Sequence, residues 1–557
     1  MWRLWRLFET SAMVLRVCRA GAVWAIASLV MPAALVAELP AVDGKWRYFT
    51  SPHFELYSRN DEKSSRELLR NLELVRAIFL ERLNLQERLR VDVTVYYFRT
   101  KAEFQAYAPD SLRKNDALAG FHLFRPDRAV ISMAPAGDSG LAQQTVFHEY
   151  VHHLFRIAEY DPPLWFNEGT AEVLAGMKVE RNRVLIGTPM ADRALFLQQQ
   201  TLLPLEQLFA ADQASKAYAD EAHTGVFYAQ SWALLHYWYF GESRIPKQAV
   251  DRFIQVAGNR EKAAAVDLRQ HFVASFGFDY REMQRRLSGY IRTGRFRAGA
   301  HPMPDLAPAS SYAMRAVPID ELVVRLAELS FRVERNAHAK LLLLEALEKR
   351  PQDARPLEVL GTDAYLEQDE AGAVEKWEQA LAVGSTNAAV IRELALMEGR
   401  RWFEKFDETF QLPAARAARM RARLLRSIEL EPHQAAAYEM LAWVEAFAAE
   451  PAVENVKRVI AQLPTMREKK RSLIALSFLM LRAGNPETAG PMLEHLGTLA
   501  LSPGEAEALS ALHAKMARDF PHAAGGGDVA EEAAEVLAPP PSTPGLKTPS
   551  LALPDDL

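Results

Sequence analysis

The chain has 557 residues, which is more than one hydrophobic core usually supports, so we expect at least two domains. Hydrophobic residues make up 49% and charged residues 25% of the sequence, as in ordinary globular proteins. A formal net charge of -5 gives no electrostatic basis for nucleic-acid binding, so we expect no nucleic-acid partner.

Residues 1–37 have the order of a secretory signal peptide. Basic residues precede an uncharged run, 20–37, and the chain becomes polar at Glu38. An uncleaved membrane anchor is the alternative, because an apolar run of this length can just span a bilayer. Both interpretations predict export to the periplasm or the medium, with membrane contact only if the segment stays attached. The single cysteine, Cys18, lies here, so a cleaved chain would have neither a disulfide nor a thiolate metal site.

The next part of the chain mixes strands with helices. Apolar residues at alternating or helical spacing indicate each element. Strands are expected within 46–57, at 91–98, at 120–124 and at 129–133, the last two as a hairpin; helices are expected at 62–84 and 101–107. This mixture, followed by helices only, predicts an α+β domain over residues 38–297.

Mostly helices are predicted after residue 140. The proline pair Pro162-Pro163 separates two of them, and a small hairpin follows. The expected helices cover 141–158, 166–175, 227–240 and 247–256, and the hairpin covers 177–187.

The last part of the chain predicts a linker and then helical repeats. Residues 298–311 contain three prolines and indicate a linker. In residues 312–520, Gly361, Ala373 and Trp377 have the spacing of a tetratricopeptide helix pair, and similar positions recur 34 residues away. An unrelated helical bundle is the alternative. Such repeats would offer a concave surface to a protein partner. Residues 521–557 are rich in Gly, Ala and Pro and predict a disordered tail.

The segment His148-Glu149-Tyr150-Val151-His152 carries the strongest chemical signal. Histidines at positions i and i+4 lie on one face of a helix, so both imidazoles can bind one metal ion. Glu149 is rotated about 100° from His148, beside the ion, where it can accept a proton from a zinc-bound water. Chance matches to this pattern occur, and a helix with two half-buried histidines is the alternative.

A second segment, Trp165 to Glu172 (WFNEGTAE), supplies the missing ligand. Catalytic zinc takes three protein ligands and keeps one open position, and Glu168 follows a turn that would bring its helix back to His152. Glu172 shares the helix face of Glu168 and can accept a hydrogen bond from a ligating histidine. Two histidines and one carboxylate can also hold Fe(II) or Mn(II), although the HExxH pattern favours Zn²⁺.

These two motifs resemble those of the gluzincins, zinc peptidases whose third ligand is the Glu of an NEGxA-type helix. The resemblance extends over about residues 45–240, and the layout is similar to peptidase-MA-like families of exported bacterial proteins. It implies a thermolysin- or aminopeptidase-like catalytic domain. It further implies His148, His152 and Glu168 as zinc ligands, Glu149 as base and Glu172 as the partner of a ligand.

Related enzymes of the aminopeptidase type use a downstream tyrosine to stabilise the oxyanion. Tyr228 is the leading candidate, with a core aromatic as the alternative, and Tyr218 and His223 are weaker candidates. His153 is rotated away from the ion and is expected to be a packing histidine.

The expected function is zinc-dependent hydrolysis of a peptide or protein substrate. Strand 129–133 lies where related enzymes place a substrate-binding edge strand, but it has no acid to hold a free amine, which favours an endopeptidase. The alternative is a protein-binding scaffold that uses the repeats and retains a degenerate or slow peptidase domain.

Overall fold

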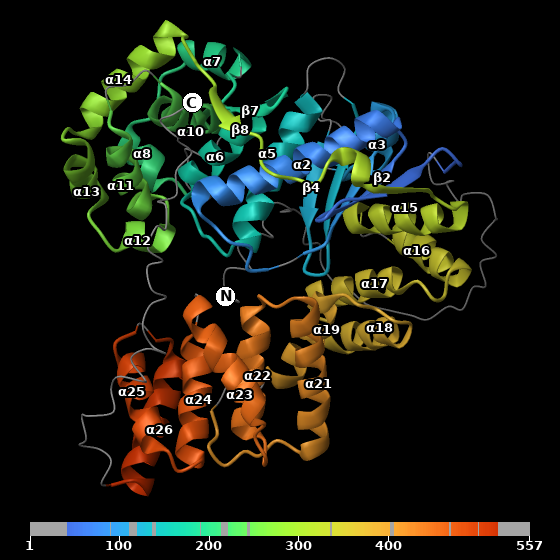
Figure 1. Ribbon diagram of the computed structural model, residues 1–557, viewed down its shortest axis with the longest axis vertical. Helices are drawn as coiled ribbons and strands as arrows, with labels where there is room; N and C mark the ends of the chain where they lie inside the picture. The colour runs from blue at the N-terminus through green and yellow to red at the C-terminus, as the bar shows by residue number, and fades with distance from the viewer. Residues whose placement is uncertain are drawn as a thin grey trace, which may run out of the picture. The chain divides into compact units, whose positions relative to one another are not determined.

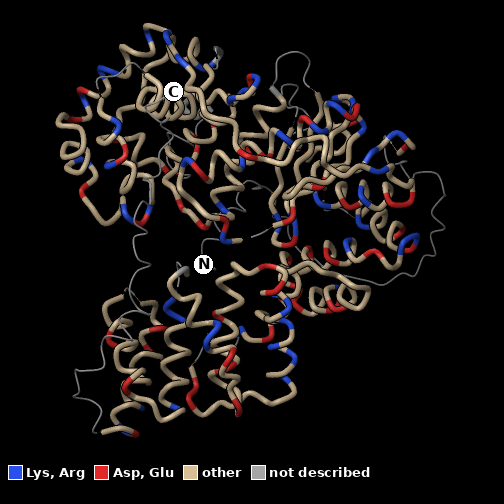
Figure 2. Tube along the Cα trace, in the orientation of Figure 1, with Lys and Arg blue, Asp and Glu red and all other residues tan. Residues whose placement is uncertain are grey.

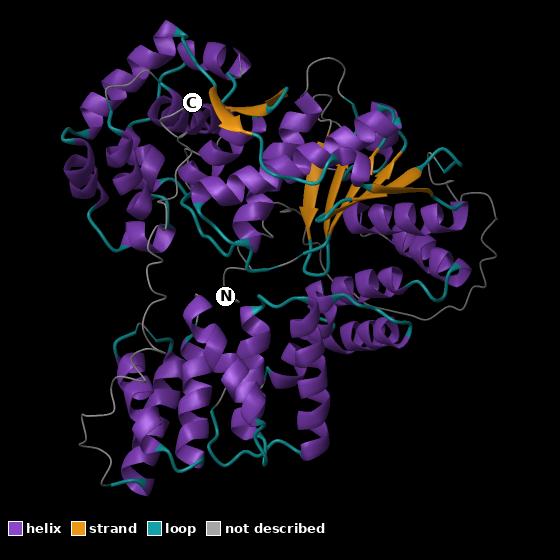
Figure 3. Cartoon of the chain, in the orientation of Figure 1, coloured by secondary structure: helices purple, strands orange, loops and turns teal. Residues whose placement is uncertain are grey.

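The computed structural model describes eleven stretches of the chain, which all lie in one compact unit, Pro40–Leu557. They are residues 42–89, 91–110, 120–135, 141–189, 191–212, 221–241, 245–334, 337–400, 406–466, 469–499 and 501–521. The expected signal segment with Cys18, the tail beyond residue 521 and Tyr218 lie outside these stretches, and the side chain of His223 is likewise not described. The fold is α+β, as predicted (Figure 3).

A six-stranded mixed sheet forms the first layer, in the order β4-β5-β3-β2-β1-β9. Strands β2, β3 and β5 are parallel to one another, whereas β1, β4 and β9 pair antiparallel with their neighbours. The strands are β1 (Arg47–Thr50), β2 (Phe54–Ser58), β3 (Val93–Tyr97), β4 (Gly120–Phe124), β5 (Ala129–Met133) and β9 (Ala313–Ala316). The predicted 120–133 hairpin forms, with Gly120 opposite Met133.

The two faces of this sheet are covered by different parts of the chain, because side chains alternate along each strand. Phe54, Leu56, Val93, Val95 and Ile131 belong to the main core. Helices α2 (Glu62–Leu83) and α5 (Leu141–Ile157) pack on this core (Figure 1). On the other face, Tyr57 and Tyr96 donate hydrogen bonds to α15 (Ile319–Glu334), at 3.0 Å each.

A helical lobe follows α5 and shares the main core. Helix α6 (Leu164–Ala175) packs against both α5 and α10 (Glu221–Phe240), and it is almost wholly buried. The other helices of this lobe are α7 (Ala191–Gln198), α8 (Leu205–Ala210), α11 (Lys247–Ala257), α12 (Arg260–Ala264), α13 (Leu268–Phe276) and α14 (Tyr280–Thr293). The short α3 (Lys101–Ala106) connects β3 to the strand β4.

The segment 298–311 enters the fold, although its composition predicts a linker. Within it, β8 (Gly299–Pro302) is the third strand of a small sheet with β6 (Lys178–Glu180) and β7 (Arg183–Ile186). A 3-10 turn, Ala309–Ser311, follows. Directly after it, β9 pairs with β1 at the edge of the large sheet. The segment differs from the prediction because its strands pair with partners that are distant in the sequence. Local composition does not indicate such pairing.

Only helices follow β9 in the described residues. The α-helices are α15, α16 (Ala337–Lys349), α17 (Ala354–Leu366), α18 (Glu370–Ala382), α19 (Ala388–Gly399), α21 (Ala414–Leu430), α22 (Ala435–Phe447), α23 (Val453–Gln462), α24 (Lys470–Arg482), α25 (Pro486–Gly497) and α26 (Pro503–Asp519), and a 3-10 turn, Leu463–Thr465, follows α23. Successive helices pack in pairs, α15 with α16 and α17 with α18. A Cβ on Gly361 would lie 2.4 Å from the Trp377 ring, so this glycine admits the indole between α17 and α18. No described helix is both long and apolar enough to cross a bilayer.

Candidate metal centre

Helix α5 carries the two histidines on one of its faces. His148 and His152 are one turn apart, and their Nε2 atoms lie 3.1 Å from each other. The opposite side of the helix holds Tyr150, Val151 and Leu154 in the main core. Core packing therefore fixes the rotation of α5, and this rotation leaves both imidazoles half-buried toward α6.

Helix α6 brings two glutamates to the histidines. Its start follows Pro162-Pro163: Pro163 has an extended conformation and is the N-cap residue, and the helix begins at Leu164. Glu168 and Glu172 are each only 4% exposed. Glu168 Oε2 lies 3.2 Å from His148 Nε2 and 3.4 Å from His152 Nε2. The structure thus places together the three residues that the sequence predicts as metal ligands.

The three ligand atoms have the spacing that a tetrahedral ion needs. Bonds of about 2.0–2.1 Å in tetrahedral geometry put neighbouring ligand atoms about 3.3 Å apart. The three separations here are 3.1, 3.2 and 3.4 Å. Glu168 Oε2 is also buried and accepts no hydrogen bond from a described residue. This donor set fits zinc and, by its chemistry, Fe(II) or Mn(II) as well.

The electrostatics of the centre favour a positive charge between these side chains. Burial alone would lower the pKa of His148, but the carboxylates of Glu168 and Glu172 outweigh it and raise the pKa to about 10. Burial opposes ionisation of Glu168, yet the two adjacent histidines lower its pKa to about 2. A divalent cation bound between these side chains would neutralise the carboxylates as a proton on His148 does, and it carries more positive charge.

Two further side chains orient the histidines. The Nδ1 atom of His152 lies 2.7 Å from Asn167 Oδ1, and His148 Nδ1 lies 3.4 Å from Glu172 Oε1. If each Nδ1 carries the hydrogen, each Nε2 keeps its lone pair for a metal. Arg193 donates two hydrogen bonds to Glu172, at 2.9 and 3.1 Å, and holds this carboxylate in place.

The sequence analysis did not identify Asn167 and Arg193 as residues that support the centre. A signal existed for Asn167, because it directly precedes a ligand on the same helix. Arg193 comes from α7, and nothing local in the sequence indicates that it reaches α6.

Tyr228 lies beside the centre on helix α10. Its ring centroid is 6.0 Å from that of His148, and the side chain is half-buried. Gly169 makes this approach possible, because a Cβ there would lie 2.8 Å from the Ser231 carbonyl oxygen and 2.9 Å from Leu235 Cδ1. The glycine that follows Glu168 thus lets α6 and α10 touch backbone to backbone.

Glu149 follows His148 on α5 and is half-buried. Within the described part of the chain, its carboxylate has neither a hydrogen-bond nor an ion-pair partner, unlike Glu168 and Glu172. A carboxylate beside the centre that no other residue engages can accept and release a proton.

His153 belongs to the core and not to the centre. It is 2% exposed and stacks on Tyr150, with ring centroids 5.5 Å apart. Burial lowers its pKa to about 3, so it is neutral and packs as an aromatic ring, as expected.

The expected edge strand needs a correction. Strand 129–133 is β5, which lies inside the sheet between β4 and β3. The edge on this side is β4, which packs against α5; a Cβ on Gly120 would lie 2.8 Å from Val146 Cγ2. The order arises because β5 pairs in parallel with β3, and the hairpin then places β4 outside.

Comparison with known proteins does not assign the chain to a group. No protein-family model matches it, and no curated protein matches it.

Proposed function

We propose that this protein is a zinc-dependent peptidase whose metal is held by His148, His152 and Glu168. The observation that carries the proposal is the spacing of the three ligand atoms, 3.1 to 3.4 Å, around a buried carboxylate oxygen without a hydrogen-bond donor. Structural zinc sites have four protein ligands, whereas three ligands leave a position for chemistry. The described residues contain no fourth His, Cys, Asp or Glu in this group.

Zinc bound there would act as a Lewis acid on the scissile carbonyl and lower the pKa of a water toward 7. Glu149 takes a proton from the attacking water on its carboxylate and later delivers it to the leaving nitrogen. Asn167 and Glu172 hold the two imidazoles in orientation. The Tyr228 hydroxyl donates a hydrogen bond to the carbonyl oxygen as it gains negative charge.

The substrate is a peptide or protein. The antiparallel edge strand β4 packs against α5, the helix of the two histidines, so an extended chain paired with this edge would pass near the centre. The acid with which related aminopeptidases hold a free amine is absent from β5. We therefore propose internal cleavage, on an exported protein whose helical repeats contact a partner or the substrate.

The first test is the metal content of the purified chain. We expect about one zinc per chain, lost in His152→Ala and kept in His338→Ala, a matched control on an exposed histidine of α16. If the purified chain neither contains zinc nor takes it up when supplied, the proposal is wrong.

The second test separates a peptidase from a scaffold. In Glu149→Gln, zinc should stay bound and hydrolysis of an unfolded protein substrate should fall by at least about 100-fold, the low end for removal of a general base. Glu180→Gln, on an exposed strand residue, should keep both properties. Equal hydrolysis by Glu149→Gln and wild type would show that the activity does not use this centre.

A further inference from the structure

A strong local excess of positive charge lies in the helical lobe, in residues 245–297. This stretch contains eleven lysines and arginines and five acids, so its net charge is +6. Since the whole chain carries -5, all other residues together carry -11. The stretch comprises the helices α11 to α14 and the segment that leads to β8. A charge asymmetry of this kind indicates an anionic partner for the basic part.

The arginines of α14 lie on one exposed face of that helix. Arg281, Arg285 and Arg292 are all exposed. At 100° and 1.5 Å per residue, they lie within about 40° of one another around the helix axis and extend over about 16 Å along it. Only the small Ser288 lies between them on this face, and the exposed Arg295 follows directly after the helix. We call these four arginines the basic face of α14 (Figure 2).

Acids do not neutralise the basic face. Glu282 is the only acid within α14, and it pairs with Arg285 at 2.7 Å. The side chain of Arg285 is nevertheless 71% exposed. No described aspartate or glutamate forms an ion pair with the other three, Arg281, Arg292 and Arg295. Their guanidinium groups are therefore available to an external anion.

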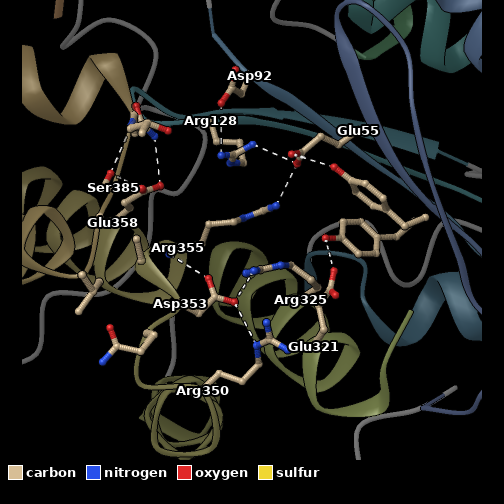
Figure 4. A pocket seen from close by; sticks show the side chains of 18 of the residues that line it. Glu55, Asp92, Arg128, Glu321, Arg325, Arg350, Asp353, Arg355, Glu358 and Ser385 are labelled. Carbon is tan, nitrogen blue, oxygen red and sulfur yellow. Dashed lines mark hydrogen bonds and ion pairs between the residues drawn. The ribbon is translucent and has the colours of Figure 1, made fainter. Parts of the chain in front are cut away.

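Arginines in other parts of the fold are matched by acids. Where the large sheet meets α15 and α17, a polar cavity of about 510 Å³ is lined by both charges (Figure 4). There Glu55 pairs with Arg128 at 3.3 Å and with Arg355 at 3.0 Å. On α21, Arg421 pairs with the buried Glu445 at 2.6 Å. These arginines balance charges inside the fold, whereas those of the basic face meet solvent.

The shape of the basic face fits an extended anionic surface. Its arginines project from the outside of one helix over about 16 Å, so a single small anion could contact only one or two of them. The face consists of arginines and one serine, so it offers no aromatic ring on which nucleic-acid bases could stack. The expected N-terminal segment, whether a signal peptide or an anchor, would bring the chain to a bilayer.

We propose that the basic face of α14 binds the surface of a bilayer that contains anionic lipids. The four guanidinium groups pair with lipid phosphates, and α14 lies on the headgroups without entering the hydrocarbon. Each basic residue near such a surface strengthens binding about 5-fold, so four together favour an anionic over a neutral bilayer by at least about 100-fold. The face would hold the protein at a bilayer even after cleavage of the N-terminal segment. It is independent of the candidate metal centre.

The test is sedimentation with lipid vesicles of the protein without residues 1–37. This chain keeps the whole compact unit, Pro40–Leu557, and removes the apolar segment that would bind any bilayer. We expect binding to phosphatidylcholine vesicles with about 30% phosphatidylglycerol and none to pure phosphatidylcholine. Binding should weaken between about 0.1 M and 1 M salt, because the Debye length falls from about 10 to 3 Å. Equal binding to both vesicles, or to neither, would overturn the proposal. Binding to polyglutamate but to neither vesicle would do the same and point to an acidic protein.

A triple variant then locates the binding. Arg281→Gln, Arg292→Gln and Arg295→Gln together break no described ion pair and change only exposed side chains. At about 5-fold for each arginine, they should weaken binding to the anionic vesicles about 100-fold. Unchanged binding would refute the assignment to this face.

The matched control removes the same charge from elsewhere. Lys63→Gln, Lys340→Gln and Arg458→Gln together change exposed residues of α2, α16 and α23. This variant should bind the anionic vesicles as the wild type does. An equal loss in both triple variants would also contradict the proposal, because it would show that binding depends on net charge and not on the basic face.

Discussion

Replacing Gly169 by alanine tests whether the close contact of α6 and α10 builds the candidate metal centre. Ordinary contacts of a Cβ begin near 3.4 Å, whereas the new atom would lie 2.8 Å from the Ser231 carbonyl oxygen. The shortfall, 3.4 minus 2.8, is 0.6 Å against backbone, which cannot rotate away as a side chain can. Helix α10 must therefore retreat, and Tyr228 moves with it.

The expected loss of stability follows from two opposing terms. Overpacking of a core costs about 1–3 kcal/mol. Replacing glycine by alanine inside a helix stabilises the helix by about 1 kcal/mol. We therefore expect Gly169→Ala to lower the free energy of unfolding by up to about 2 kcal/mol, and to weaken zinc binding because Glu168 is the adjacent residue.

Gly289→Ala is the matched control, because Gly289 lies within α14 and its Cβ would meet no atom within 4 Å. It should raise stability by about 0.5–1 kcal/mol. The assay is urea unfolding of both variants and wild type, at equal zinc, with the slope compared as well as the midpoint. If Gly169→Ala is as stable as Gly289→Ala, the contact between α6 and α10 constrains neither the fold nor the candidate metal centre.

Three other predictions concern separate features. Asn167→Ala should weaken zinc binding about 10- to 100-fold without removing a ligand, measured by competition with a chelator; an unchanged affinity would refute the orienting role. His236 hydrogen-bonds Gly187 and Tyr290, and burial lowers its pKa from 6.5 to about 4, so the unfolded chain binds the proton first as the pH falls. The buried His236 should therefore lower the free energy of unfolding by about 2 kcal/mol at pH 5 and by almost nothing at pH 7. His236→Gln should remove this pH dependence in unfolding experiments. Gly361→Ala should destabilise the helices α17 and α18 by about 1–3 kcal/mol through the clash with Trp377, seen by tryptophan fluorescence, while zinc content stays unchanged.

The sequence predicts the local elements of this protein well because their signals are local. The helix with His148 and His152, the Pro162-Pro163 break and the strands 120–124 and 129–133 appear where the spacing places them. The short distances between His148, His152 and Glu168 also agree with the motif, since the i, i+4 spacing and the buried helix α6 leave little freedom.

Features that depend on distant partners could not be predicted. The position of β4 at the edge is decided by the pairing of β5 with β3, and the addition of β9 to β1 joins residues more than 250 positions apart. The same holds for Arg193, which reaches Glu172 from another helix. The ion pair between Asp127 and Arg332 of α15 also could not be predicted. The two residues are distant in the sequence and meet only when the fold brings α15 to the sheet.

The path of residues 299–316 limits how this protein can be divided. A fragment that ends at Arg297 would lose β8 from the small sheet and β9 from the large one. It would also expose Asp127, which Arg332 neutralises at 1% side-chain exposure in the intact chain. Such a fragment would present two unpaired strand edges to solvent, which favours aggregation. A fragment made to carry the candidate metal centre alone should therefore extend at least through α15.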